Sequence, residues 1–296
     1  MSQDMYDKFQ ELREQKGSSM IVGLDPRVGN EADERTVREL AKISDGIIGF
    51  KPNGKFYFGR EELLLELAQS MDPSLIRMLD AKLSDGINTN RAEIEAITKY
   101  FDSVTIRAGA DSAPTIALAK NKLYTVGMGV MSFPAELLEM HTNYKIMKGN
   151  DFDDDTARNL IHELRLDSVK ALLEGGVDAL VMGGTAYIPE ERFGPAITKL
   201  RTNPEAVSLQ NIPEGELETL LLMRNRLFKG VVELTANTRL LYLTPGFGRQ
   251  GGNFDSFFGS GIDGKRVLFN AGSDAMKSED PRKYLREMNA KINSYL

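Results

Sequence analysis

Eight short apolar segments recur along this chain, and stretches of helical periodicity lie between several of them. The apolar segments occupy residues 19–25, 46–51, 76–82, 103–107, 123–131, 178–184, 240–245 and 266–271. Patterns such as "REELLLELAQSM", "RAEIEAITKYF" and "ARNLIHELRLDSVKALLEGG" have the apolar spacing of amphipathic helices. Strands that alternate with helices predict right-handed βαβ units and a parallel sheet. Eight strands close a (β/α)8 TIM barrel, and an open doubly wound α/β sheet is the alternative.

The length of 296 residues suits one large domain with a sizeable core. No linker, low-complexity segment or repeat divides the sequence, so we expect a single (β/α)8-barrel domain over residues 1–296. Residues 185–235 are more than one crossover needs. They predict an extra helical excursion between the sixth and seventh strands.

Composition excludes several classes of protein. There is no cysteine, so disulfides and thiolate metal sites are absent from the sequence. No run approaches the roughly 18 apolar residues of a membrane helix, and the charged, amphipathic N-terminus is unlike a signal peptide. A net charge of -6 argues against a general nucleic-acid binder. We therefore expect a cytoplasmic protein with neither a membrane nor a nucleic acid as partner.

Charged residues follow the first three predicted strands, where each strand ends. Asp25 ends "VGLD", Lys51 ends "GFK", and Asp80 and Lys82 end "MLDAK". In a parallel barrel all strands deliver their carboxyl ends to one rim, where the chemistry takes place. Charges beside apolar strands are costly unless they pair or carry out chemistry. The sequence therefore predicts a charged site at this rim.

The segment "DAKLSDGINTN" (80–90) concentrates these charges. Strand alternation places Asp80 and Lys82 on one side of the sheet. A lysine beside carboxylates stays protonated, so Lys82 is expected to act as a proton donor. Asp85 lies past the strand end, where it could face the same pocket or a neighbouring subunit. The alternative for an isolated D-x-K-x-x-D is a surface salt-bridge cluster.

The segment "TPGFGRQGGNF" (244–254) is rich in glycine after the seventh strand. Backbone N–H groups approach a phosphate closely where no side chain intervenes. Loops after strands seven and eight often form a phosphate site in these barrels. The alternative is a flexible surface loop.

Taken together, "VGLDP", "FKPN", "DAKLSDGINTN", "VMSFPAE" and "TPGFGRQGG" resemble orotidine 5'-phosphate decarboxylase. The resemblance spans roughly residues 19–285. The D-x-K-x-x-D segment is shared with the wider superfamily of sugar-phosphate decarboxylases and synthases. The lysine after the second strand and the T-P-G-x-G-x-Q-G-G loop are more particular to the orotidylate enzymes. The resemblance implies a TIM-barrel lyase that converts orotidine 5'-phosphate to UMP in pyrimidine biosynthesis.

The resemblance also implies roles for individual residues. Lys51, Asp80, Lys82 and Asp85 match the family's catalytic network, in which Lys82 would protonate C6 of the pyrimidine and Asp80 would face the substrate carboxylate. The substrate-binding positions that it implies are Asp25, Thr89, Ser132, Pro245, Gln250 and Gly251.

The same resemblance implies a homodimer with shared active sites, because the residue matching Asp85 reaches into the partner's site in that family. It implies no metal and no cofactor. The related keto-sugar-phosphate enzymes, which use magnesium, are one alternative function. A non-catalytic nucleotide-binding relative is another.

This chain departs from the family at the end of its eighth strand. The family usually has an arginine there that clamps the substrate phosphate, whereas the matching text here is "FNAGSDAM". A phosphate dianion needs compensating cationic charge. Arg249 lies on the glycine-rich loop, and we expect it to bind the phosphate in place of the missing arginine. Arg107, Lys265 and Lys277 are the other candidates for this contact.

Overall fold

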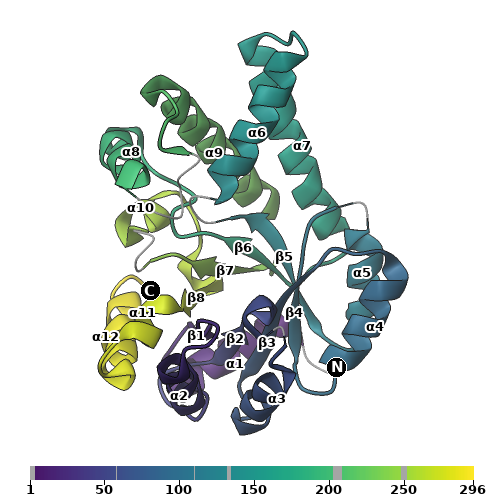
Figure 1. Ribbon diagram of the computed structural model, residues 1–296, viewed down its shortest axis with the longest axis vertical. Helices are drawn as coiled ribbons and strands as arrows, with labels where there is room; N and C mark the ends of the chain where they lie inside the picture. Colours follow the sequence, from purple (N-terminus) through teal and green to yellow (C-terminus); the bar gives the residue numbers. More distant parts are fainter. Residues whose placement is uncertain (1–3, 58, 110, 132–134, 203–208, 248–251) are drawn as a thin grey trace.

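The computed structural model describes residues 4–57, 59–109, 111–131, 135–202, 209–247 and 252–296. Its centre is a closed barrel of eight parallel strands that follow one another around the barrel in sequence order, with β8 paired to β1 (Figure 1). The strands are β1 (Met20–Leu24), β2 (Gly49–Pro52), β3 (Ile76–Leu83), β4 (Ser103–Ile106), β5 (Tyr124–Val130), β6 (Ala179–Met182), β7 (Leu241–Pro245) and β8 (Val267–Ala271). The predicted (β/α)8 barrel is confirmed, and each strand overlaps the apolar segment that predicted it.

Helices cover the outside of the barrel. They are α1 (Met5–Lys16), α2 (Glu31–Leu40), α3 (Glu61–Ser70), α4 (Ile87–Ile97), α5 (Ser112–Ala119), α6 (Ala135–Gly149), α7 (Asp154–Glu174), α8 (Phe193–Thr202), α9 (Glu214–Thr235), α10 (Phe254–Gly259), α11 (Ser273–Lys277) and α12 (Pro281–Asn293). Short 3-10 turns are η1 (Gly54–Tyr57), η2 (Glu190–Arg192) and η4 (Gly264–Arg266). Strands buried on both faces explain the near-continuous apolar runs of the sequence.

The excursion predicted between β6 and β7 is present as η2, α8 and α9. A second helical addition, which the sequence did not lead us to expect, lies between β5 and β6, where α6 precedes the crossover helix α7. Helices α6, α7 and α9 pack together and extend away from one side of the barrel (Figure 1). Both additions therefore lie on the β5–β7 side, away from the loops that follow β1, β2 and β3.

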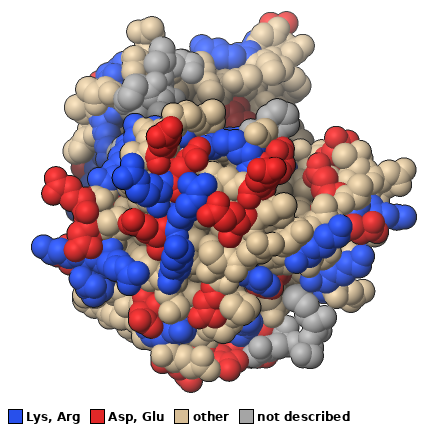
Figure 2. All heavy atoms as spheres, turned by 60° about the horizontal axis from the view of Figure 1, so that its bottom comes forward, with Lys and Arg blue, Asp and Glu red and all other residues tan. Residues whose placement is uncertain are grey.

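Positive and negative side chains are interspersed on the face of the molecule shown in Figure 2. Ion pairs also join neighbouring helices, and one of them connects Arg38 of α2 to Glu66 of α3 at 2.9 Å. Within the described ranges, no helix is both long and apolar enough to cross a membrane.

Candidate active site

A buried carboxylate lies between two lysines at the carboxyl ends of β2 and β3. Asp80 accepts a hydrogen bond from Lys51 Nζ on Oδ2 at 2.9 Å and one from Lys82 Nζ on Oδ1 at 2.7 Å. Lys51 and Asp80 are both more than 90% buried, whereas the Lys82 side chain is 38% exposed. Three of the four predicted catalytic residues thus form one cluster, and Lys82 is the member that opens to solvent.

Lys82 has an unusual backbone conformation. Its φ of 54° lies in the left-handed region, which costs a non-glycine residue free energy. The pairing of β3 with β4 shifts register between Leu79 and Leu83. We predicted that simple strand alternation would bring Asp80 and Lys82 together. The two side chains do meet, but that reason was wrong, because the backbone at Lys82 is not extended.

Thr105 on β4 holds this conformation in place. Its Oγ1 accepts the backbone N–H of Lys82 at 2.8 Å and donates to Asp80 Oδ1 at 2.9 Å. One hydroxyl therefore fixes both the backbone of the lysine and the side chain of its carboxylate partner. Sequence reasoning missed Thr105, although a polar residue inside the apolar segment "SVTIR" was a signal.

The three charges change one another's proton affinity. Burial alone would raise the pKa of Asp80, but the ammonium groups of Lys51 and Lys82 outweigh burial and hold that pKa well below its usual range. Burial opposes the charge of Lys51, yet Asp80 and Asp25 outweigh it, and the pKa of Lys51 is raised. At Lys82 burial prevails over Asp80, so its pKa is lowered. Lys82 is therefore a stronger acid than a free lysine.

Asp25 stands beside this cluster at the end of β1. Its Oδ1 accepts the backbone N–H of Asn53 at 3.1 Å. Burial raises the pKa of Asp25, and the charge of Lys51 opposes that shift. The predicted position of Asp25 on the same rim as Lys51 is confirmed.

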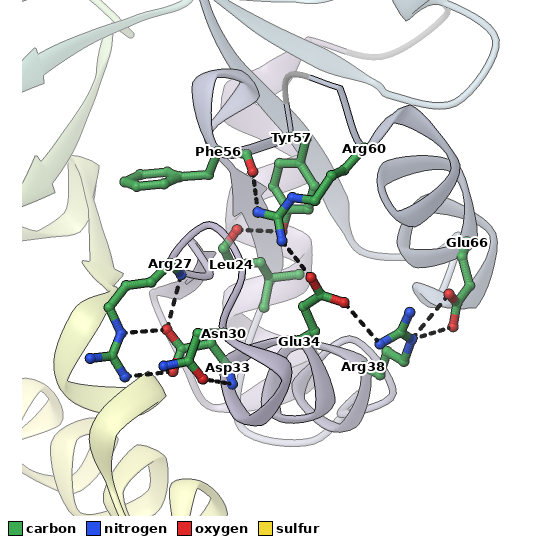
Figure 3. Close-up of polar contacts among 10 residues, drawn as sticks. All are labelled: Leu24, Arg27, Asn30, Asp33, Glu34, Arg38, Phe56, Tyr57, Arg60 and Glu66. Carbon is green, nitrogen blue, oxygen red and sulfur yellow. Dashed lines mark hydrogen bonds and ion pairs between the residues drawn. The ribbon is translucent and has the colours of Figure 1, made fainter.

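Polar contacts fix the loops that follow β1 and β2 (Figure 3). Tyr57 of η1 donates its hydroxyl to the carbonyl of Leu24 at 2.6 Å, which ties the β2 loop to the end of β1. Arg60 bonds to Glu34 of α2 at 2.6 Å and to the carbonyl of Phe56. Because these contacts connect β1, η1 and α2, the rim around Asp25 is held from outside the barrel.

A cavity of about 430 Å³ adjoins the cluster through Asp25. On one side it is lined by Lys55 and Phe56, which follow β2. Its opposite side is formed by the ends of β7 and β8, with Pro245 and Asn270, and by the loops after them, with Gly246 and Gly272. The space thus extends from the end of β2 towards β8, where the sequence predicted a phosphate, and it also reaches α12, whose Tyr284 and Met288 line it.

Asp85 and Thr89 do not join the cluster within one chain. Asp85 is exposed in the loop after β3, and its Oδ1 accepts the backbone N–H of Gly86 at 2.6 Å. It lines a separate hollow of about 190 Å³ together with Arg107. Thr89 is exposed in the first turn of α4.

Four further predicted site residues, Ser132, Arg249, Gln250 and Gly251, lie outside the described residues, and their roles stay predictions. Among the residues that are described, no group of three or more histidine, aspartate or glutamate side chains is placed to hold a metal ion.

Comparison with known proteins finds solved structures with a similar fold. No protein-family model and no curated protein matches the chain. Among solved structures, UMP synthase from Leishmania donovani superposes with a TM-score of 0.65 and 21% identity over 99% of this chain, which spans 57% of that protein's length. Leishmania donovani OMP decarboxylase gives a TM-score of 0.61 and 20% identity, with 98% of each chain covered.

A third similar structure is orotidine 5'-monophosphate decarboxylase from Methanocaldococcus jannaschii, complexed with the inhibitor BMP. Its TM-score is 0.56 and its identity 15%, with 93% of this chain and 98% of that chain covered. At such identities the likeness shows a shared barrel fold.

Proposed function

We propose that this protein decarboxylates orotidine 5'-phosphate to UMP in the cytoplasm, as a step of pyrimidine biosynthesis, without a metal or a cofactor. The observation that carries the proposal is the arrangement of Asp80 between Lys51 and Lys82 at the barrel rim. The similarity in fold to decarboxylases of this substrate supports it.

The chemistry requires a fixed proton donor. The bond between C6 of the pyrimidine and its carboxylate breaks, carbon dioxide leaves, and the electron pair stays on C6. The ammonium of Lys82 then gives a proton to C6, which completes UMP. Charge that develops in a transition state is stabilised best by groups already in position. Asp80 and Thr105 hold Lys82 there, and the lowered pKa of Lys82 eases the transfer.

Substrate binding is proposed along the cavity. Asp25 accepts hydrogen bonds from the ribose hydroxyls, as its place beside Lys51 allows. Pro245 lines the cavity at the end of β7. From the sequence alone we propose that Ser132 contacts the pyrimidine, that Gln250 bridges the phosphate and the base, and that Gly251 lies at the phosphate.

The direct test is an assay of carbon dioxide release and UMP formation from orotidine 5'-phosphate, with and without EDTA. We expect turnover that chelation does not change. Loss of activity in EDTA and its recovery with magnesium would instead favour a keto-sugar-phosphate enzyme. UMP binding without any turnover would indicate a non-catalytic relative.

We also propose a homodimer in which Asp85 and Thr89 complete the partner's site. Both residues are exposed in the single chain. Mixing the inactive variants Lys82→Ala and Asp85→Ala tests this. If Asp85 acts in the partner's site, each heterodimer has one intact site and one doubly defective site, so activity partly returns. No recovery after verified subunit exchange would place Asp85 in its own chain's site or outside catalysis.

A further inference from the structure

The loop after β8 offers little positive charge to a substrate phosphate. From Asn270 to Lys277 the sequence contains one cation, Lys277. Two other cations that the sequence offered for the phosphate contact, Lys265 and Arg107, lie elsewhere. Lys265 belongs to η4, before β8, at the end of the barrel opposite the rim. Arg107 lines the hollow of Asp85, on the far side of the β3 loop.

The neighbouring loop, after β1, is the nearest source of a replacement. Strands β1 and β8 are hydrogen-bonded neighbours, with Val22 paired to Ala271. Their ends lie so close that a Cβ built on Gly23 would be 3.0 Å from Gly272 Cα. Helix α11 also packs against both β1 and α2. The loops after β1 and β8 therefore leave the barrel side by side.

Arg27 in the β1 loop is oriented by Asp33. Its Nε and Nη2 donate to the two carboxylate oxygens at 2.7 and 2.9 Å, and Asp33 also accepts the backbone N–H of Arg27 at 2.9 Å. This pairing uses one edge of the guanidinium group, so the edge that carries Nη1 faces away from Asp33. The Arg27 side chain is 65% exposed, and Figure 3 shows it next to the ribbon of the C-terminal helices.

Lys277 reaches the same place from α11. Asp33 lines the same cavity as Lys277, and the hydrogen bond from Arg27 and, more weakly, the charge of Lys277 lower the pKa of Asp33. Arg27 and Lys277 both line the cavity that contains Asp25 and Gly272. Asp33 and Asp274 line the same cavity, so the two cations face two carboxylates, and the Nη1 edge of Arg27 and the ammonium of Lys277 are the groups that can donate to an anion there.

We propose that Arg27 and Lys277 bind the phosphate monoester of the substrate at the β1–β8 edge of the cavity, in place of an arginine after β8. This inference rests on the proposed function, which puts the ribose at Asp25. A 5'-phosphate then extends along the cavity, away from Lys82. An arginine fork already held by a carboxylate loses little freedom when it binds a second anion.

Steady-state kinetics on four single variants test the proposal. We expect Arg27→Ala and Lys277→Ala each to raise KM for orotidine 5'-phosphate about 10- to 100-fold, the range for one charge-assisted hydrogen bond. Arg27→Lys keeps the charge but not the fork, so it should recover part of the loss. Arg35→Ala removes an exposed arginine of α2 and should behave as wild type. Thermal unfolding of each variant checks that the fold is intact.

Calorimetry separates this inference from the proposed reaction. Wild-type protein should bind UMP much more tightly than uridine, and the double variant Arg27→Ala, Lys277→Ala should lose that preference. If wild type fails to decarboxylate but shows this pattern, the proposed function is overturned and the phosphate site stands. If the double variant keeps the preference while Arg249→Ala loses it, the phosphate belongs to the β7 loop and this proposal is overturned.

Discussion

Two clusters of buried charge lie at the carboxyl ends of the barrel strands, and they differ in what surrounds them. The first is the Asp80 cluster of Lys51, Asp80 and Lys82. The second, here called the Glu136 cluster, joins Glu136 of α6 to Arg165 of α7 at 2.9 Å. Both contain a carboxylate that is at least 90% buried and bonded to cationic groups. Burial of charge therefore does not distinguish them.

The Glu136 cluster is closed. Glu136 is fully buried and accepts the backbone N–H of Met131 at 2.9 Å in addition to the guanidinium of Arg165. Arg224 of α9, which is 1% exposed, donates to Thr185 at 3.1 Å beside it, and burial lowers the pKa of Arg224 to about 10. These contacts tie α6, α7 and α9 to the loops after β5 and β6. Two buried charged residues, Glu136 and Arg224, thus anchor the helical additions.

The Asp80 cluster is open and strained. The Lys82 side chain reaches solvent, and its backbone is held in the left-handed region. The pKa shifts of the two carboxylates also run in opposite directions. Burial raises the pKa of Glu136 against the opposing effect of Arg165, whereas two ammonium groups lower that of Asp80. Local backbone strain at a charged residue, more than burial, marks a candidate site for chemistry.

The largest difference between the two clusters is expected when Lys82, the exposed partner of Asp80, is replaced. Lys82→Ala should lower the decarboxylation rate by about 10⁴-fold or more, because Lys82 is the proton donor of the proposed mechanism. Its free energy of unfolding should change by less than about 1 kcal/mol, since Lys51 still pairs with Asp80. Single-turnover kinetics and urea unfolding measure the two quantities. Rapid turnover by this variant would remove Lys82 from the mechanism.

The Glu136 cluster should respond in the opposite way. Glu136→Ala leaves Arg165 and the backbone N–H of Met131 without their buried acceptor, so we expect a loss of about 3–5 kcal/mol in unfolding free energy. The control is Glu139→Ala, which removes a half-exposed partner of the same arginine and should cost less than about 1 kcal/mol. Equal losses for both variants would show that burial of Glu136 is not what anchors the helices.

The smallest expected effect tests the backbone strain at Lys82. At a left-handed position glycine avoids a penalty of about 1–2 kcal/mol but loses part of that gain to chain entropy. Lys82→Gly should therefore be about 1 kcal/mol more stable than Lys82→Ala, and we expect both variants to be inactive.

Lys55, whose φ is not positive, supplies the matched control for that comparison. Lys55→Gly should be less stable than Lys55→Ala, as glycine usually is. Denaturant unfolding of the four variants gives both differences. If the stability difference between the glycine and alanine variants had the same sign at both positions, that result would contradict backbone strain at Lys82.

The sequence by itself determined the barrel and the identity of its charged rim. Alternating apolar and helical periodicities are local properties of the chain, so eight strands and their ends could be located without coordinates. Once strand ends are known, a parallel barrel brings Asp25, Lys51 and Asp80 to one edge whatever the details of packing. The helix α6 was missed because its own apolar spacing is weak and its packing partners are the distant helices α7 and α9.

The tertiary structure alone decided how the rim residues meet. The left-handed backbone of Lys82 depends on a register shift against β4 and on the hydroxyl of Thr105, which are set by pairing between segments more than 20 residues apart. The orientation of Arg27 likewise follows from α2 presenting Asp33 to the β1 loop. Such contacts depend on where whole elements pack against one another, and no local pattern of residues encodes that placement.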